Sequence, residues 1–497
     1  MNLHTETATS PVQLVGFEDD VRTALQDGKV PGAAVLIMKD GEVLLSQGFG
    51  KRNVTENLDV TPRTLFPIGS SSKAFTSAAI AMLVEEGRLA WDTPIKKYLS
   101  TFKMHDQFAT ERMTVRDLLC HRSGLPRHEF LWYGSSMTRK DMVKRLGYLE
   151  PSVDFRALYQ YNNLMYATAG YLIELVTRQP WEEFVAARIF KPLGMGSSNT
   201  AVEDSQKTDD YALPYEERKG KIEEVPFYST FQAIGPAGSI NTNLEDMEHW
   251  LRFQLNEGKH GETQLLATEQ LIENHIPNIV IPQGDAIPMG KHPEIANWCY
   301  GQGWFVGTYR GHRMVQHGGS IDGFMAEVVL LPDEHIAAAV FTNRGSSMAP
   351  FIIALTACDR MLSAEKADWN GRLQKESSDL KAQAEKQLAE MQEAEPAIPG
   401  THASHTLDAY CGRYENPGYG VVTISQVVDA LQCTYNDIPS SLTHVHYDIF
   451  ELNLERFEFK TRVSFATGDK GDIESLAVKL EPTVKALVFT RIPEQEA

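Results

Sequence analysis

Strand-like segments stand at both ends of the main part of the chain, and this placement constrains the fold most. Residues 32–50 read GAAVLIMKDGEVLLSQGFG, two apolar runs joined at Asp40-Gly41, a dipeptide typical of a hairpin turn. Residues 303–344 contain three further runs that we interpret as strands. The turns among them are expected at Arg310 to Arg313 and at Pro332 to His335. Helical patterns fill most of the region between, so we predict an α/β (α+β) fold of roughly 360 residues, with one antiparallel sheet built from both ends and covered by helices.

The composition changes after Asp359. Residues 364–395 are rich in Ala, Gln, Lys and Glu and poor in large apolar side chains, which predicts a solvated helical connector. From Leu407 onward, short alternating runs are separated by turn residues, which is typical of a small all-β barrel or sandwich. We therefore divide the chain into a tail (1–14), a catalytic domain (15–362), a connector (363–400) and a separately folding β domain (401–497).

The composition also excludes several functions. The 47 Lys and Arg residues face 66 Asp and Glu residues, and the net charge of −19 disfavours nucleic acids and anionic membranes as partners. The N-terminus has neither a basic nor an apolar export region, and no long apolar run occurs, so we expect a cytoplasmic protein. The five cysteines are scattered without CxxC spacing, which fits a reducing compartment and predicts no metal site. No sequence feature calls for a cofactor.

The stretch FPIGSSSKAF places a lysine, Lys73, in the first turn of a predicted helix. A helix N-terminus carries partial positive charge, so a cation is unfavourable there. Ser70 and Lys73 are three residues apart and therefore lie on one face of the helix. Burial and the helix N-terminus both disfavour a charged lysine, and a neutral amine can take the proton of a serine hydroxyl. The pair thus has the composition of an activated nucleophile.

A structural interpretation stays open for this pair. Ser70 or Ser71 can serve as an N-cap, and Lys73 can be a solvated side chain. The Ser-x-x-Lys spacing alone is weak evidence, because it recurs in the chain at Ser100/Lys103, Ser363/Lys366 and Ser378/Lys381.

Two more motifs follow the first in the chain. Tyr161 and Asn163 precede a second predicted helix, which Asn163 can also simply cap while Tyr161 packs as a staple. His317 precedes two glycines, and Ser320 lies at the mouth of a strand, where a structural histidine in a tight turn is the alternative.

Taken in order, these motifs resemble those of the serine β-lactamase and penicillin-binding-protein superfamily. A Tyr-x-Asn second motif and a His-x-Gly third motif make the chain most similar to the class C β-lactamase branch, with its serine esterases and D-aminopeptidases. The stretches Met113 to Pro126 and Pro236 to Met247 also resemble that branch. The resemblance covers residues 15 to 360 approximately, and the final β unit resembles a lipocalin-like domain that some of these proteins append.

The resemblance implies a role for each motif residue. Ser70 would be the nucleophile, Lys73 its base or proton partner, and Tyr161 the acid/base that protonates the leaving group. Asn163 would orient the substrate or Lys73. Whether the lysine or the tyrosine is the acylation base stays open.

The third motif departs from the family pattern, because His317 replaces the usual lysine. It would offer a hydrogen-bond donor or a switchable charge near Tyr161 and the substrate carboxylate. Gly318 and Gly319 would allow the substrate to approach, and the N–H groups of Ser70 and Ser320 would form an oxyanion hole. Without a fixed cation, efficient β-lactamase activity is not expected.

The resemblance therefore predicts a serine hydrolase that cleaves a small ester or amide through an acyl-enzyme on Ser70. A short peptide containing a D-amino acid is one candidate substrate. The alternatives are a weak β-lactamase, an acyltransferase on the same scaffold, or a catalytically silent binding or assembly protein. A homo-oligomer is also an open alternative.

Overall fold

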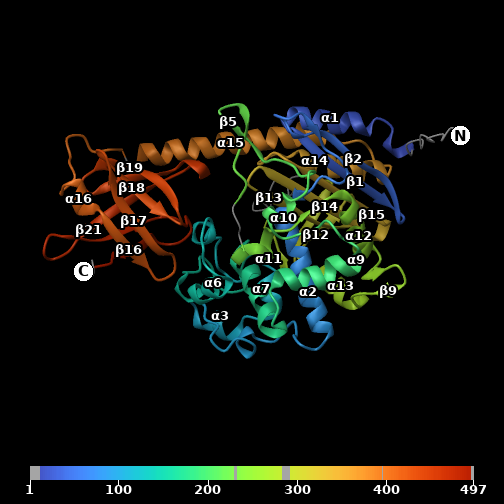
Figure 1. The fold of residues 1–497 in the computed structure, drawn as a ribbon, viewed down its shortest axis with the longest axis horizontal. Helices are drawn as coiled ribbons and strands as arrows, with labels where there is room; N and C mark the ends of the chain where they lie inside the picture. Colours follow the sequence, from blue (N-terminus) through green and yellow to red (C-terminus); the bar gives the residue numbers. More distant parts are fainter. Residues whose placement is uncertain (1–11, 229–231, 283–291, 395, 494–497) are drawn as a thin grey trace. The chain divides into compact units, whose positions relative to one another are not determined.

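A computed structural model describes residues 12–228, 232–282, 292–394 and 396–493 (Figure 1). Of the predicted N-terminal tail, residues 1–11 lie outside the described residues, and Val12–Leu14 forms the short helix η1. The chain folds into two compact units, each assembled from several segments. The first unit takes in residues up to 93, 114–120 and 169–381, and the second takes in 94–113, 121–168 and 382 onward.

A nine-stranded antiparallel sheet forms the centre of the first unit. Its order is β10-β11-β12-β13-β14-β15-β1-β2-β3. The strands are β1 (Gly32–Lys39), β2 (Glu42–Asn53), β3 (Leu58–Asp59), β10 (Ile279–Val280), β11 (Ile295–Tyr300), β12 (Phe305–Tyr309), β13 (His312–Ile321), β14 (Phe324–Leu331) and β15 (Ile336–Thr342). β1 pairs with β15, placing Val35 opposite Val340, so the two ends of the region share one sheet as predicted.

The turns of this sheet follow the sequence signals closely. Asp40 and Gly41 both have positive φ, at 52° and 78°, which a two-residue hairpin of this kind requires. The first of the three predicted runs is in fact two strands, because the turn at Arg310-Gly311 reverses the chain within it. A further reversal at Asp322-Gly323, between β13 and β14, was not predicted although it has the same Asp-Gly dipeptide.

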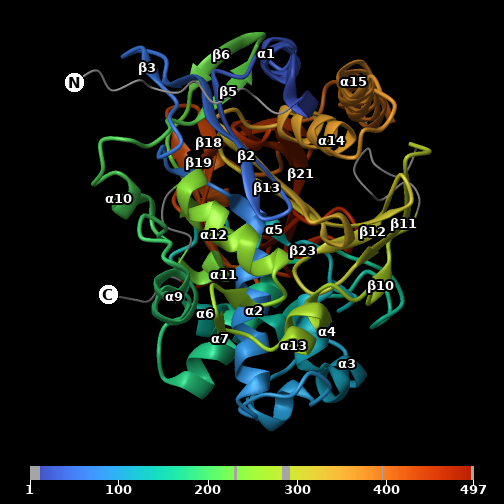
Figure 2. The same ribbon diagram turned by 90° about the vertical axis from the view of Figure 1, so that its right-hand side faces the viewer.

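Helices cover both faces of the sheet. α1 (Phe17–Asp27) and α14 (Ala349–Met361) pack together on one face. α12 (Leu244–Leu255) contacts β1 and β15, while α2 (Ser72–Glu85) contacts α13 (Thr268–Asn274) and α11 (Gly235–Gly238) (Figure 2). Further helices of this unit include α4 (Val115–Leu119), α8 (Trp181–Val185), the π-helix η5 (Ala186–Phe190), α9 (Lys191–Leu193) and α10 (Val202–Ser205). No helix in the described ranges is both long and apolar enough to span a membrane.

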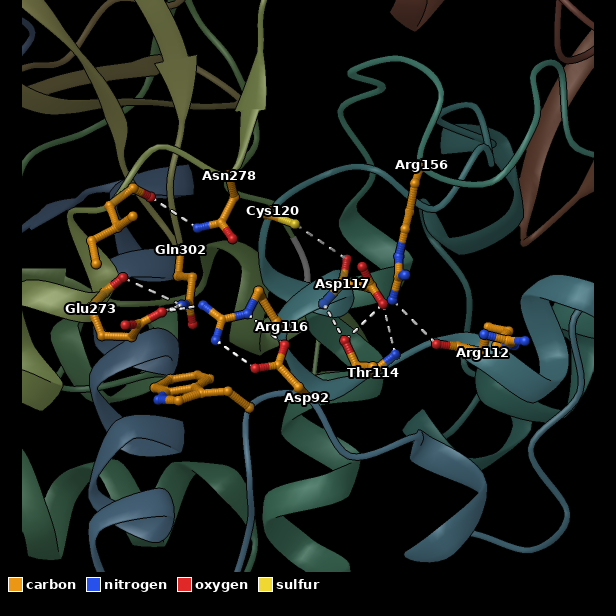
Figure 3. A network of polar contacts seen from close by, with 12 residues as sticks. Asp92, Arg112, Thr114, Arg116, Asp117, Cys120, Arg156, Glu273, Asn278 and Gln302 are labelled. Carbon is orange, nitrogen blue, oxygen red and sulfur yellow. Dashed lines mark hydrogen bonds and ion pairs between the residues drawn. The ribbon is translucent and has the colours of Figure 1, made fainter.

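The short helix α4 is fixed by polar contacts at its start. Thr114 and Asp117 form a reciprocal capping box, and Arg116 binds the carboxylates of Asp92 and Glu273 (Figure 3). These carboxylates raise the pKa of Arg116 further above its ordinary value, with the hydrogen bond to Asp92 as the largest cause.

The second unit contains helices and a closed β-barrel. Its helices are α3 (Gln107–Arg112), α5 (Glu129–Trp132), α6 (Arg139–Arg145), the start of α7 (Asn163–Thr177) and α16 (Leu407–Tyr410). The barrel strands are β16 (Gly412–Asn416), β17 (Gly420–Val427), β18 (Ala430–Tyr435), β19 (Ile438–His446), β20 (Ile449–Leu454), β21 (Phe459–Thr467), β22 (Ile473–Val478) and β23 (Leu487–Arg491). Pairing of Tyr414 with Arg491 joins the first strand to the last, so the predicted all-β unit is a barrel.

The predicted connector is the helix α15 (Trp369–Ala394), but it does not begin as a solvated spacer. Trp369 and Leu373 are each 1% exposed, and the Trp369 Nε1–H donates to Asp359 Oδ2 at 2.9 Å. Two large apolar side chains at the start of the helix are therefore part of a packed core, which the low apolar content of the whole segment concealed. The division of the chain at residues 362 and 400 stays a prediction.

Candidate active site

The start of α2 brings Ser70 and Lys73 together. A 3₁₀ turn, Gly69–Ser71, leads into the helix, and Gly87 ends it with a φ of 68°, as the sequence indicated. The Lys73 side chain is fully buried, and its Nζ donates to Ser70 Oγ at 3.0 Å and to Ala237 O at 2.8 Å. Lys73 is therefore not a solvated side chain.

The segment around Ala237 holds the first turns of α2 in place. Thr76 Oγ1 donates to Pro236 O at 2.7 Å, and the Ile240 N–H donates to Ser72 Oγ at 3.0 Å. Together with Ala237 O, these groups fix the rotation of the helix and therefore the direction of the Lys73 amine. The sequence showed only that residues 236–247 resemble a family stretch, and gave no sign of this contact.

Strand β13 passes very close to the 3₁₀ turn. Ser71 Oγ donates to His317 O at 2.9 Å. A Cβ on Gly319 would lie 1.8 Å from Ile68 O, and a Cβ on Gly69 would lie 2.7 Å from the backbone nitrogen of Ser320. Glycine is therefore needed at both positions, since any side chain would push the strand and the turn apart. Gly319 lies beside the backbone nitrogen of Ser70, and Gly69 lies beside the backbone nitrogen of Ser320. Their role as an oxyanion hole stays a prediction.

His317 lies within β13 and not in a tight turn. Its Nδ1 is 2.6 Å from Gly318 O, and its Nε2 is 2.8 Å from the Tyr300 hydroxyl. Because a carbonyl can only accept, Nδ1 carries the hydrogen, and Nε2 of a neutral ring then accepts from Tyr300. Burial, and next the charge of Lys73, lower the pKa of His317 to about 3. These contacts argue against a switchable charge at this position.

A buried acid that the sequence analysis missed lies behind the third motif. Glu327 is paired with Gly318 in the β13–β14 register and is 1% exposed. Burial raises the pKa of this carboxyl well above its ordinary value, because the charged form would be poorly solvated there. A Cβ on Gly318 would lie 2.8 Å from Glu327 Oε2, so this carboxyl lies close to the first glycine of the motif. A lone acid in the apolar run FMAEVVLL was the available signal.

Asn163 does not cap α7, contrary to one interpretation of the sequence. The cap is its neighbour Asn162, whose Oδ1 accepts from the Met165 N–H at 3.1 Å. Asn163 instead directs its amide nitrogen to Glu129 Oε1 at 3.3 Å, and its Oδ1 is buried without a hydrogen-bond partner among the described residues. The side chain of Asn163 is thus left for a purpose other than helix initiation.

Tyr161 packs between two cationic or titratable groups of the second unit. The ring of His121 lies 4.2 Å from the Tyr161 ring, and the Arg127 guanidinium carbon lies 5.0 Å from its centroid. His121 Nδ1 accepts from the Asn162 N–H at 3.1 Å, which fixes the backbone beside the tyrosine. Neither His121 nor Arg127 was predicted, although both lie in or beside the family-like stretch that ends at Pro126.

The structure thus gathers the predicted residues in two groups. Ser70 and Lys73 lie with the segment 317–320 in the first unit, and Tyr161 and Asn163 lie in the second. Within the described ranges, no three His, Cys, Asp or Glu side chains are grouped so that they could hold a metal ion.

Comparison with protein families divides the chain in two. The family model described as Beta-lactamase matches residues 17–357, which include all three motifs. A model described as a domain of unknown function, DUF3471, matches residues 396–491, which include the barrel.

Individual proteins match over most of the chain. "Unguisins hydrolase ungD'" of Aspergillus campestris is 29% identical over 435 residues, covering 82% of this chain and 77% of that protein. "Unguisins hydrolase ungD" of Aspergillus violaceofuscus is 28% identical over 519 aligned residues, covering 97% and 91%. Among solved structures, the octameric penicillin-binding protein homologue from Pyrococcus abyssi has a TM-score of 0.63 at 23% identity, covering 96% of this chain and 99% of that one. That structure supports the fold, including the C-terminal barrel.

Proposed function

We propose that this chain, which belongs to the Beta-lactamase family, is a serine hydrolase that cleaves a small ester or amide through an acyl-enzyme on Ser70. The observation that carries the proposal is the buried Lys73 amine, which lies between Ser70 Oγ and Ala237 O. A lysine in this position has a hydrogen-bond acceptor for one N–H and directs its nitrogen at the serine oxygen. It is suited to accept the serine proton.

In the proposed reaction, a neutral Lys73 amine takes the hydroxyl proton as Ser70 Oγ bonds to the substrate carbonyl carbon. The carbonyl oxygen becomes an oxyanion, which the N–H groups of Ser70 and Ser320 would stabilise. When the carbonyl re-forms, the bond to the leaving group breaks, and Tyr161 gives that group a proton. Water then attacks the acyl-enzyme and gives a proton to Tyr161, and Lys73 returns the proton that it holds to Ser70 Oγ as the acid product leaves.

Side chains of the second and third motifs have supporting roles in this proposal. His317 is neutral and hydrogen-bonded to Tyr300, so it holds the backbone of β13 and does not supply a cation. Asn163 would orient the substrate, because its Oδ1 has no partner among the described residues. A β-lactam carboxylate would lack the fixed cation that the family's lysine supplies, and we rank β-lactamase activity below ester and amide hydrolysis.

For the substrate class, our proposal draws on the similar proteins. Two of them are named as unguisin hydrolases, and one of these matches along 97% of the chain. We therefore favour hydrolysis, with a D-amino-acid-containing peptide as one candidate substrate, over acyl transfer or a silent binding role.

We also propose a cytoplasmic location and a homo-oligomer. The closed eight-stranded barrel supports the lipocalin-like description of the C-terminal domain.

The test compares two neighbouring serines, Ser70 and Ser71. A fluorophosphonate probe should label the wild type and the Ser71→Ala variant but not Ser70→Ala, because Lys73 Nζ donates to Ser70 Oγ whereas Ser71 Oγ donates to His317 O. Hydrolysis of p-nitrophenyl esters, D- and L-aminoacyl p-nitroanilides and nitrocefin then ranks the substrate classes. Labelling that persists in Ser70→Ala contradicts the proposal.

Further variants test whether the residues act together. Ser70→Ala and Lys73→Ala should each abolish nearly all activity, and the double variant should be scarcely worse, since residues of one catalytic unit are non-additive. Tyr161→Phe should lose about 10²- to 10⁴-fold while staying folded, as expected for a positioned acid/base. Independent, multiplying losses, or a fully active Tyr161→Phe variant, would remove the residue concerned from the mechanism.

A further inference from the structure

Residues 127–133 lie between the barrel and the Tyr161 motif, and they contact both. All these parts belong to the second unit. The contacts alternate along the segment, with Arg127 and Glu129 bound to the motif, and His128 and Phe130 bound to the barrel.

On the barrel side, His128 is fully buried and held at two points. Its backbone N–H donates to Glu481 Oε2 at 3.0 Å, and its Nδ1 lies 2.7 Å from the Tyr419 hydroxyl. His128 has a φ of 48°, a left-handed conformation that is unfavourable for a residue with a side chain. The two contacts to the barrel therefore select a backbone geometry that the segment would rarely adopt alone.

Phe130 and the residues after it extend this attachment. The Phe130 ring lies 5.2 Å from the rings of both Phe457 and Phe459. Asn436 Nδ2 donates to Phe130 O at 3.2 Å and to Tyr133 O at 3.0 Å. Phe130 and Tyr133 also line the apolar interior of the barrel, where the remaining cavity is only about 30 Å³. The space beside these two rings is thus too small for more than a few water molecules.

On the side of the Tyr161 motif, one carboxylate oxygen of Glu129 contacts both Arg127 and Asn163. Glu129 Oε1 accepts from Arg127 Nε at 2.8 Å and from Asn163 Nδ2 at 3.3 Å. The Arg127 guanidinium covers the Tyr161 ring at 5.0 Å. The pair therefore contacts both residues of the second motif at once.

We propose that the barrel is a positioning element of the active site. By fixing His128 and Phe130, it sets the backbone from which Arg127 and Glu129 hold Tyr161 and Asn163. This inference rests on the proposed function, in which Tyr161 moves a proton and Asn163 orients the substrate. Tyr419 and Glu481 are then positioning residues on the C-terminal domain, although they lie more than 250 residues from the motif in the sequence.

The barrel supplies a matched pair of tyrosines for the test in the full-length protein. Tyr419 and Tyr414 are both buried, and the Tyr414 hydroxyl donates to Tyr410 O at 2.8 Å, away from the segment. We expect Tyr419→Phe to lower kcat roughly tenfold with KM within twofold, since small misplacements of catalytic groups are costly. Tyr414→Phe should change the melting temperature by a similar amount and leave kcat unchanged.

A second comparison changes Glu129, which contacts the Tyr161 motif. Glu129→Ala should lower kcat, whereas Glu129→Gln should recover most of it, because the amide oxygen still accepts from Asn163. Equal kcat values for the two tyrosine variants, or for Glu129→Ala and the wild type, would overturn the inference. Loss of activity in Ser70→Ala, measured beside them, shows that the proposed function still stands. Activity that persists in Ser70→Ala would instead refute the proposed function.

Discussion

Replacing Gly319 by alanine should abolish most activity by separating β13 from the turn that carries Ser70. The added Cβ would lie 1.8 Å from Ile68 O and 3.1 Å from the Ser70 nitrogen, and both are backbone atoms. An ordinary contact begins at 3.4 Å, so the two backbone segments would have to separate by 1.6 Å. Because a misplacement of about 1 Å can cost about 10²-fold in rate, we expect kcat/KM to fall by at least that factor.

Gly318→Ala is the matched control for this prediction. The two positions are adjacent in one strand, and the change in backbone propensity is the same. At Gly318, however, the new Cβ would meet the end of a flexible side chain, Glu327 Oε2, at 2.8 Å. A small rotation of the carboxyl relieves this contact, so the loss should stay within about tenfold, as for a tolerated overpacking.

The assay is kcat/KM on a p-nitrophenyl ester together with the rate of fluorophosphonate labelling. Circular dichroism melting checks that each variant is folded. A Gly319→Ala enzyme within threefold of wild type would refute the reasoning, because the backbone contact would then not set the geometry of Ser70. Equal large losses in both glycine variants would refute it as well, since the two faces of the strand would not differ.

Two further predictions concern stability. His317 and His275 are buried with their pKa values lowered from 6.5 to about 3, chiefly by desolvation, so the unfolded chain binds protons below pH 6.5 that the folded chain does not. Stability should therefore fall as the pH drops from 6.5 toward 3, by about 1.4 kcal/mol per pH unit for each histidine, and urea titrations of the wild type and His275→Gln should show the smaller slope in the variant. A chain ending at Asp359 should melt well below one ending at Lys381, because removal of Trp369 exposes a packed core at a cost of about 3–5 kcal/mol; equal melting temperatures would contradict this.

The sequence predicted the fold best where local chemistry decides the geometry. The Asp40-Gly41 turn needs two residues with positive φ, and Asp-Gly is a dipeptide that supplies them. The runs on either side are apolar or alternate between apolar and polar residues, so the hairpin could be predicted. The contact of Trp369 with Asp359 and the packing of Phe130 against Phe457 and Phe459 could not be predicted. Each depends on a partner in another element, and nothing in the local pattern specifies which surface will cover an apolar side chain.

The same distinction separates the predicted from the missed site residues. A spacing of three residues places Ser70 and Lys73 on one helical face in any helix, so their contact could be inferred. Ala237 and Ile68 contribute only backbone oxygens, which every residue type carries, so no residue type marks them. Asn162 and Asn163 are chemically equivalent caps, and only the position where α7 begins decides which of them caps the helix and which does not.

The neutral third motif has an electrostatic consequence for the first. The charge of Lys73 already opposes protonation of His317, so the two positions lie within electrostatic reach of each other. A permanent cation at residue 317 would oppose a charged Lys73 in the same way, in a site where burial already penalises charge. A neutral histidine removes that repulsion and leaves the Lys73 amine its hydrogen bonds to Ser70 and Ala237. Compared with a permanent cation, the neutral histidine therefore favours a proton on Lys73, which in the proposed reaction stabilises the lysine once it has taken the serine proton.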